Sequence, residues 1–295
     1  MLKAVPKSAS APNLALTAPA DILLEPLIRQ ALAEDLGRAG DITTNAVIPS
    51  DLKWRGVFAA RQNGVVAGQD LARLAFHALD PSVVFEPRMK DGDTIKPRDI
   101  IATVSGPARA IITGERVALN FMCRLSGIAT ATRVLVEAAK PHKARICCTR
   151  KTTPGLRLVE KYAVRVGGGL NHRFGLDDAV LIKDNHIAAA GGIGPAVLRA
   201  RDAVGHLVKL ELEVDSLDQL KEALELPIDA VLLDNMNPAM LTTAVEMVKG
   251  RFMTEASGRV TAESVAAIAA SGVDVISCGW ITHSAPILDI GLDDA

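Results

Sequence analysis

The sequence contains no apolar run that approaches the roughly 18 residues of a membrane helix. Its net charge is only −1, from 33 basic and 34 acidic side chains, so no overall field would draw the chain to nucleic acid or to an anionic membrane. With 295 residues, 49% of them apolar, the chain can build one large domain or two modest ones. We therefore expect a soluble protein in which any basic site is a local feature.

The four cysteines lack the C-x-x-C spacing of metal and redox motifs, and the two adjacent ones would make a poor structural disulfide. This pattern indicates a reducing compartment, and we expect a cytoplasmic protein. The first 20 residues are rich in Ala, Pro and Ser, which is typical of a disordered tail and not of a signal peptide. The motifs H-E-x-x-H, G-x-S-x-G and G-x-x-x-x-G-K-S/T are absent, which removes support for zinc proteolysis, serine hydrolase chemistry and P-loop hydrolysis.

The first half of the chain has the pattern of an α+β domain. Residues 21–36 predict an amphipathic helix that ends at Gly37, and residues 40–44 predict a loop. Short β-type runs then alternate with turn signals from residue 53 to residue 104, around one short helix. The buried face of the first helix is expected to consist of Ile22, Leu23, Leu27, Ile28 and Leu32.

The second half has a different rhythm. Residues 111–139 are mostly helical in pattern, with an interruption predicted near Gly127, and lead into a second domain. Beyond Pro141, six β-like runs are separated by helical stretches, and this β-α alternation predicts parallel strands covered by helices. Either a barrel or a doubly wound sheet could result. The six runs are ARICCT, DAVLIK, LVKLELEV, DAVLLD, FMTEAS and DVISCG.

Ionisable residues or small residues that admit an anion stand at or just after the end of each run. A charge at one strand end usually marks only the emergence of the chain into water. In a barrel, however, the carboxyl ends of the strands converge on the active site, whereas in an open sheet they would lie in a row. Six such ends in register therefore favour a barrel with one pocket. The residues are Arg150-Lys151, Lys183-Asp184, Glu213, Asp234, Glu255 with Ser257-Gly258, and Gly279.

The stretch from Thr149 to His186 carries the local excess of basic residues. Three glycines before Asn171 let the backbone turn, so that His172 and Arg173 can point into the barrel mouth. Arginine forks and lysine point charges together suit one ligand with several anionic groups, or two anionic substrates. Three further cations at i, i+4 and i+8 on the preceding helix are predicted to form a solvated outer stripe and are left out of the site. They are Arg157, Lys161 and Arg165.

Two acidic residues face these cations from other strand ends. Glu213 and Asp234 could bind sugar hydroxyls, hold Mg²⁺ beside a pyrophosphate, or neutralise the lysines structurally. Ser257-Gly258 before a helix, with Gly279 at another strand end, is an arrangement found in barrel phosphate sites. Glycosyl or phosphoribosyl chemistry therefore remains open.

Five segments in order resemble the quinolinate phosphoribosyltransferases, also called carboxylating nicotinate-nucleotide pyrophosphorylases: TRKTTPGLR, GGGLNHRFGLDDAVLIKDNHI, LELEV, LLDN and EASG. The similarity extends from about Ile22 to Ile290. It implies an α/β fold, with an N-terminal α+β sandwich domain followed by an incomplete, six- to seven-stranded α/β barrel, assembled as a homodimer or hexamer. The expected divisions are a disordered tail at 1–20, the sandwich domain at 21–128, to which 286–295 could return, and the catalytic barrel at 129–285.

The resemblance also implies the reaction and its residues. Phosphoribosyl pyrophosphate would react with quinolinate, with loss of CO₂ and pyrophosphate, to give nicotinate mononucleotide in de novo NAD biosynthesis. Lys151, Lys183, Glu213 and Asp234 would be catalytic, and Mg²⁺ would be held by Glu213 and Asp234, indirectly through the substrate. Quinolinate would be bound by Arg116, commonly from across the dimer interface, and by Arg150, Lys151, His172, Arg173 and Lys183. The remaining predicted substrate contacts are Thr149, Ser257, Gly258, Arg259, Cys278 and Gly279.

Three residues depart from the pattern of the family: Cys148 stands where many relatives carry Asp, Arg259 follows Ser-Gly, and Trp280 replaces a small residue. Three alternatives remain: a related barrel of the molybdenum-transport type, a phosphoribosyltransferase for another pyridine carboxylate, and a non-catalytic binder of an anionic metabolite. A silent binder would have no need of Glu213 and Asp234. A monocarboxylate substrate would leave some buried cations unpaired, at a cost of ~1 to 3 kcal/mol.

Overall fold

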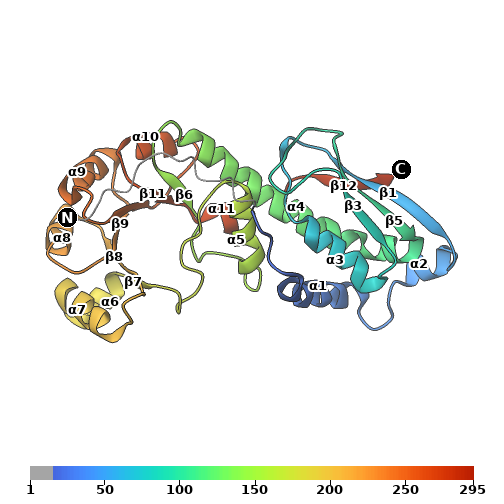
Figure 1. Ribbon diagram of the computed structural model, residues 1–295, viewed down its shortest axis with the longest axis horizontal. Helices are drawn as coiled ribbons and strands as arrows, with labels where there is room; N and C mark the ends of the chain where they lie inside the picture. Colours follow the sequence, from blue (N-terminus) through green and yellow to red (C-terminus); the bar gives the residue numbers. More distant parts are fainter. Residues whose placement is uncertain (1–15) are drawn as a thin grey trace, which may run out of the picture.

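The computed structural model describes residues 16–295, so most of the predicted tail, residues 1–15, lies outside the described residues. The described chain forms an antiparallel layered part and a parallel α/β part, with the long helix α4 (Ala108–Ala138) running between them (Figure 1). Within this range no helix is long and apolar enough to cross a membrane.

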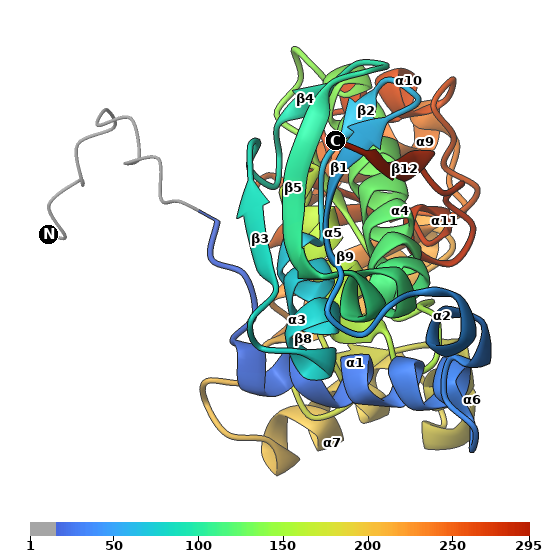
Figure 2. The same ribbon diagram turned by 90° about the vertical axis from the view of Figure 1, so that its right-hand side faces the viewer.

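The first part is built on a four-stranded antiparallel sheet in the order β12-β1-β5-β3. In β1 (Lys53–Ala60), exposed and buried residues alternate, so that Gly56, Phe58 and Ala60 face the core, as a half-buried strand requires. Figure 2 shows β3, β5 and β1 side by side in front of α4. The other strands of this part are β2 (Gly64–Val65), β3 (Val84–Pro87), β4 (Thr94–Ile95), β5 (Ile100–Pro107) and β12 (Ile290–Asp294).

The last strand belongs to this sheet although it ends the chain. β12 pairs with β1 in antiparallel register, with Leu292 opposite Phe58. The core beneath the sheet contains Phe58, Phe76 and Phe85, with edge-to-face contacts from Phe58 to the other two rings. The helices of this part, besides α4, are α1 (Asp21–Leu36), α2 (Ile42–Val47) and α3 (Gln69–Leu79).

Two expectations for the N-terminal segment were wrong. The predicted loop at 40–44 contains the start of helix α2, because the Asp41 carboxylate accepts a hydrogen bond of 2.8 Å from the Thr44 backbone N–H and caps the helix. Helix α1 has the predicted bounds, but Ile22 and Leu23 are exposed, and its buried face is Leu24, Ile28 and Leu32. The residues that pack on the core are therefore spaced i, i+4 and i+8, and the side chains of the first helical turn lie outside the core.

The predicted interruption of α4 was also wrong, since the helix runs unbroken through Gly127. Glycine usually weakens a helix, but here it makes room for another segment of the chain. A Cβ atom at position 127 would collide with the carbonyl oxygen of Pro286 and would lie 3.0 Å from Cα of Ile287. Gly127 therefore lets the segment that leads to β12 cross directly over α4.

We expect Gly127→Ala to lower the free energy of unfolding by about 1 to 3 kcal/mol, the usual cost of overpacking a close contact. Urea denaturation would measure the change. Gly205→Ala is the matched control, because nothing lies within 4 Å of a Cβ at that position. Equal stability of the two variants would contradict the proposed role of this contact.

The second part is a parallel sheet of six strands in the order β6-β11-β10-β9-β8-β7. Strands β7 to β11 follow one another around the sheet and β6 closes the series beside β11, which is the circular order of a barrel and not of a doubly wound sheet. Among the described residues no pairing joins β6 to β7, so the barrel is open there. The strands are β6 (Arg145–Cys147), β7 (Val180–Ile182), β8 (Leu210–Val214), β9 (Ala230–Asp234), β10 (Met253–Ser257) and β11 (Val275–Ser277).

The predicted fold class is therefore confirmed: an N-terminal antiparallel layer and an incomplete parallel α/β barrel. Strand β8 illustrates how the sequence produces it, because Leu210, Leu212 and Val214 are buried while Glu211 and Glu213 share the opposite face. The apolar face packs against helices and the glutamates point into the barrel. The helices of this part are α5 (Arg157–Val166), α6 (Asp184–Ala190), α7 (Ile193–Ala203), α8 (Leu217–Ala223), α9 (Pro238–Val248), α10 (Val265–Ala270) and α11 (Trp280–His283).

Candidate active site

The carboxyl ends of the barrel strands surround a cavity of about 430 Å³. It contains five of the predicted cations, on the segments that follow β6, α5 and β7, and three of the predicted carboxylates, two at the ends of β8 and β9 and one in β10. The convergence of strand ends expected from the sequence is thus present. The predicted residues that line this cavity are Thr149, Arg150, Lys151, His172, Arg173, Lys183, Glu213, Asp234, Glu255 and Ser257.

A second cavity, of about 360 Å³, adjoins the first and shares Thr149, Lys151, Asp234, Ser257 and Ser277 with it. It lies over the ends of β9, β10 and β11 and contains Arg259 and His283 as further basic groups. The mouth therefore has two connected lobes, each with its own cations. The predicted residues found only in this second lobe are Gly258, Arg259, Cys278 and Gly279.

The turn in the second lobe is shaped by glycine and by positive φ angles. Gly258 has φ +102°, and a Cβ there would collide with the side chain of Asn235, so only glycine fits. At Gly279, a Cβ would lie 3.1 Å from Cδ of Lys151. The Trp280 indole donates a hydrogen bond of 2.9 Å to the Val260 carbonyl, which anchors its ring at one wall of this lobe.

Two arginines in the first lobe have donors that the protein does not use. Among the described residues, Nε of Arg150 and Nε of Arg173 are buried and have no hydrogen-bond partner. Nη1 of Arg173 is held by the Ala179 carbonyl at 2.7 Å. Burial and the neighbouring charge of Arg150 lower the pKa of Arg173. Such buried guanidinium donors call for an anionic acceptor, since an unpaired buried donor is costly.

The two carboxylates at the strand ends have partners of different kinds. Glu213 forms an ion pair with the Lys183 ammonium, and Asp234 accepts a hydrogen bond of 2.6 Å from the Asn235 amide. Both residues are only half-buried and line the first lobe. They therefore offer hard oxygen ligands at its centre.

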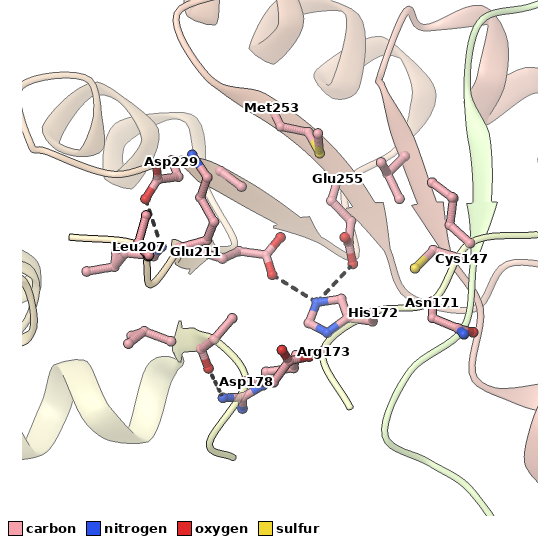
Figure 3. Close-up of a pocket in the computed structure, with 17 residues that line it drawn as sticks. Cys147, Asn171, His172, Arg173, Asp178, Leu207, Glu211, Asp229, Met253 and Glu255 are labelled. Carbon is pink, nitrogen blue, oxygen red and sulfur yellow. Dashed lines mark hydrogen bonds and ion pairs between the residues drawn. The ribbon is translucent and has the colours of Figure 1, made fainter. Parts of the chain in front are cut away.

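His172 lies inside the barrel between two glutamates (Figure 3). Its Nε2 is 2.9 Å from Oε2 of Glu211 and 3.8 Å from Oε1 of Glu255, a buried oxygen without a hydrogen-bond partner among the described residues. The ring separates the first lobe from a cavity of about 550 Å³ toward the opposite end of the barrel. His172 therefore lies at the floor of the mouth, not at its rim.

The electrostatics of this trio favour a positive imidazole. Burial alone would lower the pKa of His172, but the hydrogen bond to Glu211 and the charge of Glu255 outweigh burial and raise it. Burial and the charge of Glu211 raise the pKa of Glu255 to about 7. In the described part of the chain, these three residues also form the one group of three or more His, Cys, Asp and Glu side chains that could together hold a metal ion.

The predicted solvated stripe on α5 was wrong for two of its three members. Lys161 is 2% exposed and donates to Cys148 Sγ and to the His172 carbonyl, and Arg157 donates to the carbonyls of Arg150 and Phe174. Only Arg165 is exposed. Arg165 lies eight residues after Arg157, and this spacing rotates its side chain by about 80° around the helix axis. Arg165 therefore points away from the helix face on which Arg157 and Lys161 contact the segments of the mouth.

The structure does not bring Arg116 to the mouth of its own chain. This residue is exposed on α4 and lines neither lobe. Four residues of the site were missed in the sequence: Glu211, Asn235, Ser277 and His283. The alternation of LELEV could have revealed Glu211, because it places both glutamates on the face opposite the leucines. Nothing in the sequence singles out the other three.

A barrel whose strand ends place arginines, lysines and carboxylates around two adjoining lobes has the site of an α/β-barrel protein that binds anionic ligands. Residues 41–126 match the N-terminal domain and residues 128–293 the C-terminal domain of quinolinate phosphoribosyl transferase. This chain belongs to the quinolinate phosphoribosyl transferase family.

Individual relatives agree with this assignment. The chain is 43% identical to the probable nicotinate-nucleotide pyrophosphorylase [carboxylating] of Bacillus subtilis over 270 residues, which is 92% of this chain and 93% of that protein. It is 47% identical to the chloroplastic enzyme of that name from Arabidopsis thaliana, over 91% of this chain and 82% of the relative. The nicotinate-nucleotide pyrophosphorylase structure from Francisella tularensis matches with a TM-score of 0.90 at 38% identity, over 95% of this chain and 98% of that chain.

Proposed function

We infer that this chain is a carboxylating nicotinate-nucleotide pyrophosphorylase of de novo NAD biosynthesis. It transfers the phosphoribosyl group of phosphoribosyl pyrophosphate to quinolinate. The quinolinate nitrogen forms a bond to ribose C1 as pyrophosphate leaves with its electron pair. The bond to the 2-carboxylate then breaks, CO₂ departs, and the electron pair left on the ring carbon, stabilised by the pyridinium, takes up a proton. The products are nicotinate mononucleotide, pyrophosphate and CO₂.

The observation that carries the proposal is the pair of buried, unused guanidinium donors in the first lobe. Nε of Arg150 and Nε of Arg173 have no partner among the described residues, while Lys183 and Lys151 line the same cavity. A pyridine dicarboxylate would supply two anionic groups to this set, as bidentate arginine contacts favour. His172 would donate from Nδ1 to the same ligand, because its Nε2 is engaged by Glu211.

The second lobe is assigned to the phosphoribosyl donor. Ser257, Gly258 and Gly279 would bind the 5-phosphate through hydroxyl and backbone N–H groups, with Arg259, Cys278 and Thr149 completing the wall. Lys151 lines both lobes, so its ammonium would stabilise the charge of the departing pyrophosphate. Glu213 and Asp234 would bind the ribose hydroxyls and stabilise the positive charge that develops at C1.

The carboxylates of the first lobe also suit Mg²⁺, which the proposed reaction would use as its cofactor. The Glu213 and Asp234 carboxylates are hard oxygen ligands, but each already has a partner in Lys183 or Asn235. They would therefore hold the ion indirectly, through water and the substrate. When bound, Mg²⁺ would neutralise the negative charge of the leaving pyrophosphate.

The proposal extends to the assembly. Arg116 lies exposed on α4, away from the mouth of its own chain, and would reach the quinolinate of a neighbouring subunit in a homodimer or a hexamer. A cytoplasmic location stays a prediction from the cysteines, which are all free thiols in the described residues.

The direct test incubates the purified full chain with quinolinate, phosphoribosyl pyrophosphate and Mg²⁺, and follows nicotinate mononucleotide and CO₂ in equal amounts. A parallel reaction replaces quinolinate with nicotinate, which has one carboxylate fewer and leaves buried donors unpaired. We expect product only with quinolinate. Consumption of nicotinate with no turnover of quinolinate would overturn the assignment.

A further inference from the structure

Lys161 presents a charge that the site described above does not explain. Its ammonium is carried by α5 into the interior, where the residue is 2% exposed. Two acceptors are within reach of Nζ: Sγ of Cys148 at 3.1 Å and the carbonyl of His172 at 2.9 Å. A buried ammonium is costly unless an opposite charge accompanies it.

The neighbouring carboxylates are engaged elsewhere. Glu160, the residue before Lys161, is turned toward Arg124 and Thr153. Glu211 pairs with His172 across the barrel. None of the ion pairs formed by the described residues involves Lys161. The one group in contact with the ammonium that can become negative is the thiol of Cys148, which is itself fully buried.

We propose that Cys148 is a thiolate that forms a buried ion pair with Lys161, and that this pair is a positioning device for the substrate-binding loops. The thiolate stands at the end of β6, one residue before the Thr149-Arg150-Lys151 segment. Through Lys161 it is tied to the His172 carbonyl, and so to the segment that carries His172 and Arg173. One charge pair therefore fixes both cationic segments relative to α5.

The surroundings of the sulfur support its negative form. The neighbouring Cys147 thiol and the charge of Lys161 lower the pKa of Cys148 to about 6, against the effect of burial. The neighbouring Cys148 sulfur and burial raise the pKa of Cys147, which stays a thiol. Asn171 places Oδ1 3.3 Å from Sγ, and a half-turn of this amide would offer its NH₂ to a thiolate.

The other titratable groups facing this cluster balance its charge. His172 and Lys161 are the two cations, and Glu211 and the Cys148 thiolate are the two anions. Glu255 also faces the cluster, and burial with the charge of Glu211 raises its pKa to about 7. Below that pKa the cluster is neutral with Cys148 ionised, and would carry an excess positive charge with Cys148 as a thiol.

The charge state of Cys148 can be tested without substrate, so this test does not depend on the proposed function. The positioning role does rest on the proposed function, because it concerns quinolinate binding. Thiolates absorb in the ultraviolet where thiols do not, so the full chain would be titrated from about pH 5 to 9, across the free-thiol pKa of about 8.5. We expect a step near the pKa of about 6 that persists in Cys123→Ser, disappears in Cys148→Asp, and moves toward the free-thiol value in Lys161→Met. A step that survives in Cys148→Asp, or no step below pH 8 in the wild type, would overturn the proposal.

The positioning role is tested by kinetics with quinolinate. Cys148→Asp keeps a negative charge beside Lys161 and should stay within about threefold of the wild-type kcat/KM. Cys148→Ser should raise the KM for quinolinate about tenfold to a hundredfold, since displacing binding groups by about 1 Å has effects of this size. The double variant Cys148→Ser, Lys161→Met leaves no unpaired charge and should fold, yet keep the raised KM. Wild-type KM in the double variant would contradict positioning.

Discussion

Replacing Arg150 with alanine should lower kcat/KM for quinolinate by about 10²- to 10³-fold, the size of the loss when one preorganised donor to a charged group is removed. The reason is that Arg150 lines the first lobe, while its buried Nε has no partner among the described residues. The free energy of unfolding should barely change, because Arg157 donates its hydrogen bond to the backbone carbonyl of Arg150. This contact does not involve the Arg150 guanidinium. Steady-state kinetics and urea denaturation would measure both quantities.

Arg165→Ala is the matched control, since Arg165 is an exposed arginine on α5 outside the mouth, and its kcat/KM should stay at the wild-type value. Lys183→Ala should lower kcat/KM for quinolinate by a similar factor to Arg150→Ala. This variant also removes the ion-pair partner of Glu213. If Arg150→Ala unfolded the protein, the guanidinium would be a structural group. If the folded variant kept the wild-type kcat/KM, the assignment of the first lobe to quinolinate would lose its main support.

The strand-end residues were predictable because two short-range regularities are sufficient to place them. Alternation within a strand assigns each side chain to a face, and parallel strands bring their carboxyl ends together. The sequence therefore predicts that Glu213 and Asp234 line one cavity, and the structure places both in the first lobe. Glu211 obeys the same alternation, but it lies in the middle of β8, where the strand-end criterion gives no signal.

Other residues could not be interpreted because their roles depend on contacts distant in sequence. Lys161 has the spacing of a solvated stripe, and only its contact with Cys148 reveals a buried charge. Gly127 looks like a helix breaker until the segment at Pro286 is seen to cross it. Arg116 is exposed on α4 and lines neither lobe, so the structure of this chain alone does not test its predicted contact with quinolinate. For Lys161 and Gly127, the residue type indicated an unusual position, and only the tertiary structure shows what the residue contacts.

The largest effect on stability is expected for Glu160→Ala, which should lower the free energy of unfolding by about 3 to 5 kcal/mol, as removal of one partner from a buried ion pair does. Glu160 is fully buried and accepts hydrogen bonds from Arg124 at 2.8 Å, from the Thr153 backbone at 3.0 Å and from the Thr153 hydroxyl at 2.8 Å. Arg124 in turn donates to the Thr282 and Ala285 carbonyls. Glu160 thus joins α5 to α4 and, through Arg124, to α11 and the residues that follow it.

The matched control is Glu137→Ala, which removes a glutamate whose ion pair with Lys140 is exposed and should change stability by about 0 to 1 kcal/mol. Urea denaturation of both variants would measure the difference. Glu160→Gln should lie between them, because the amide oxygen can still accept from Thr153 but carries no charge for Arg124. A loss equal to that of Glu137→Ala would mean that water reaches the Arg124 guanidinium when the carboxylate is removed, and the junction between α4 and α5 would then be held by apolar packing alone.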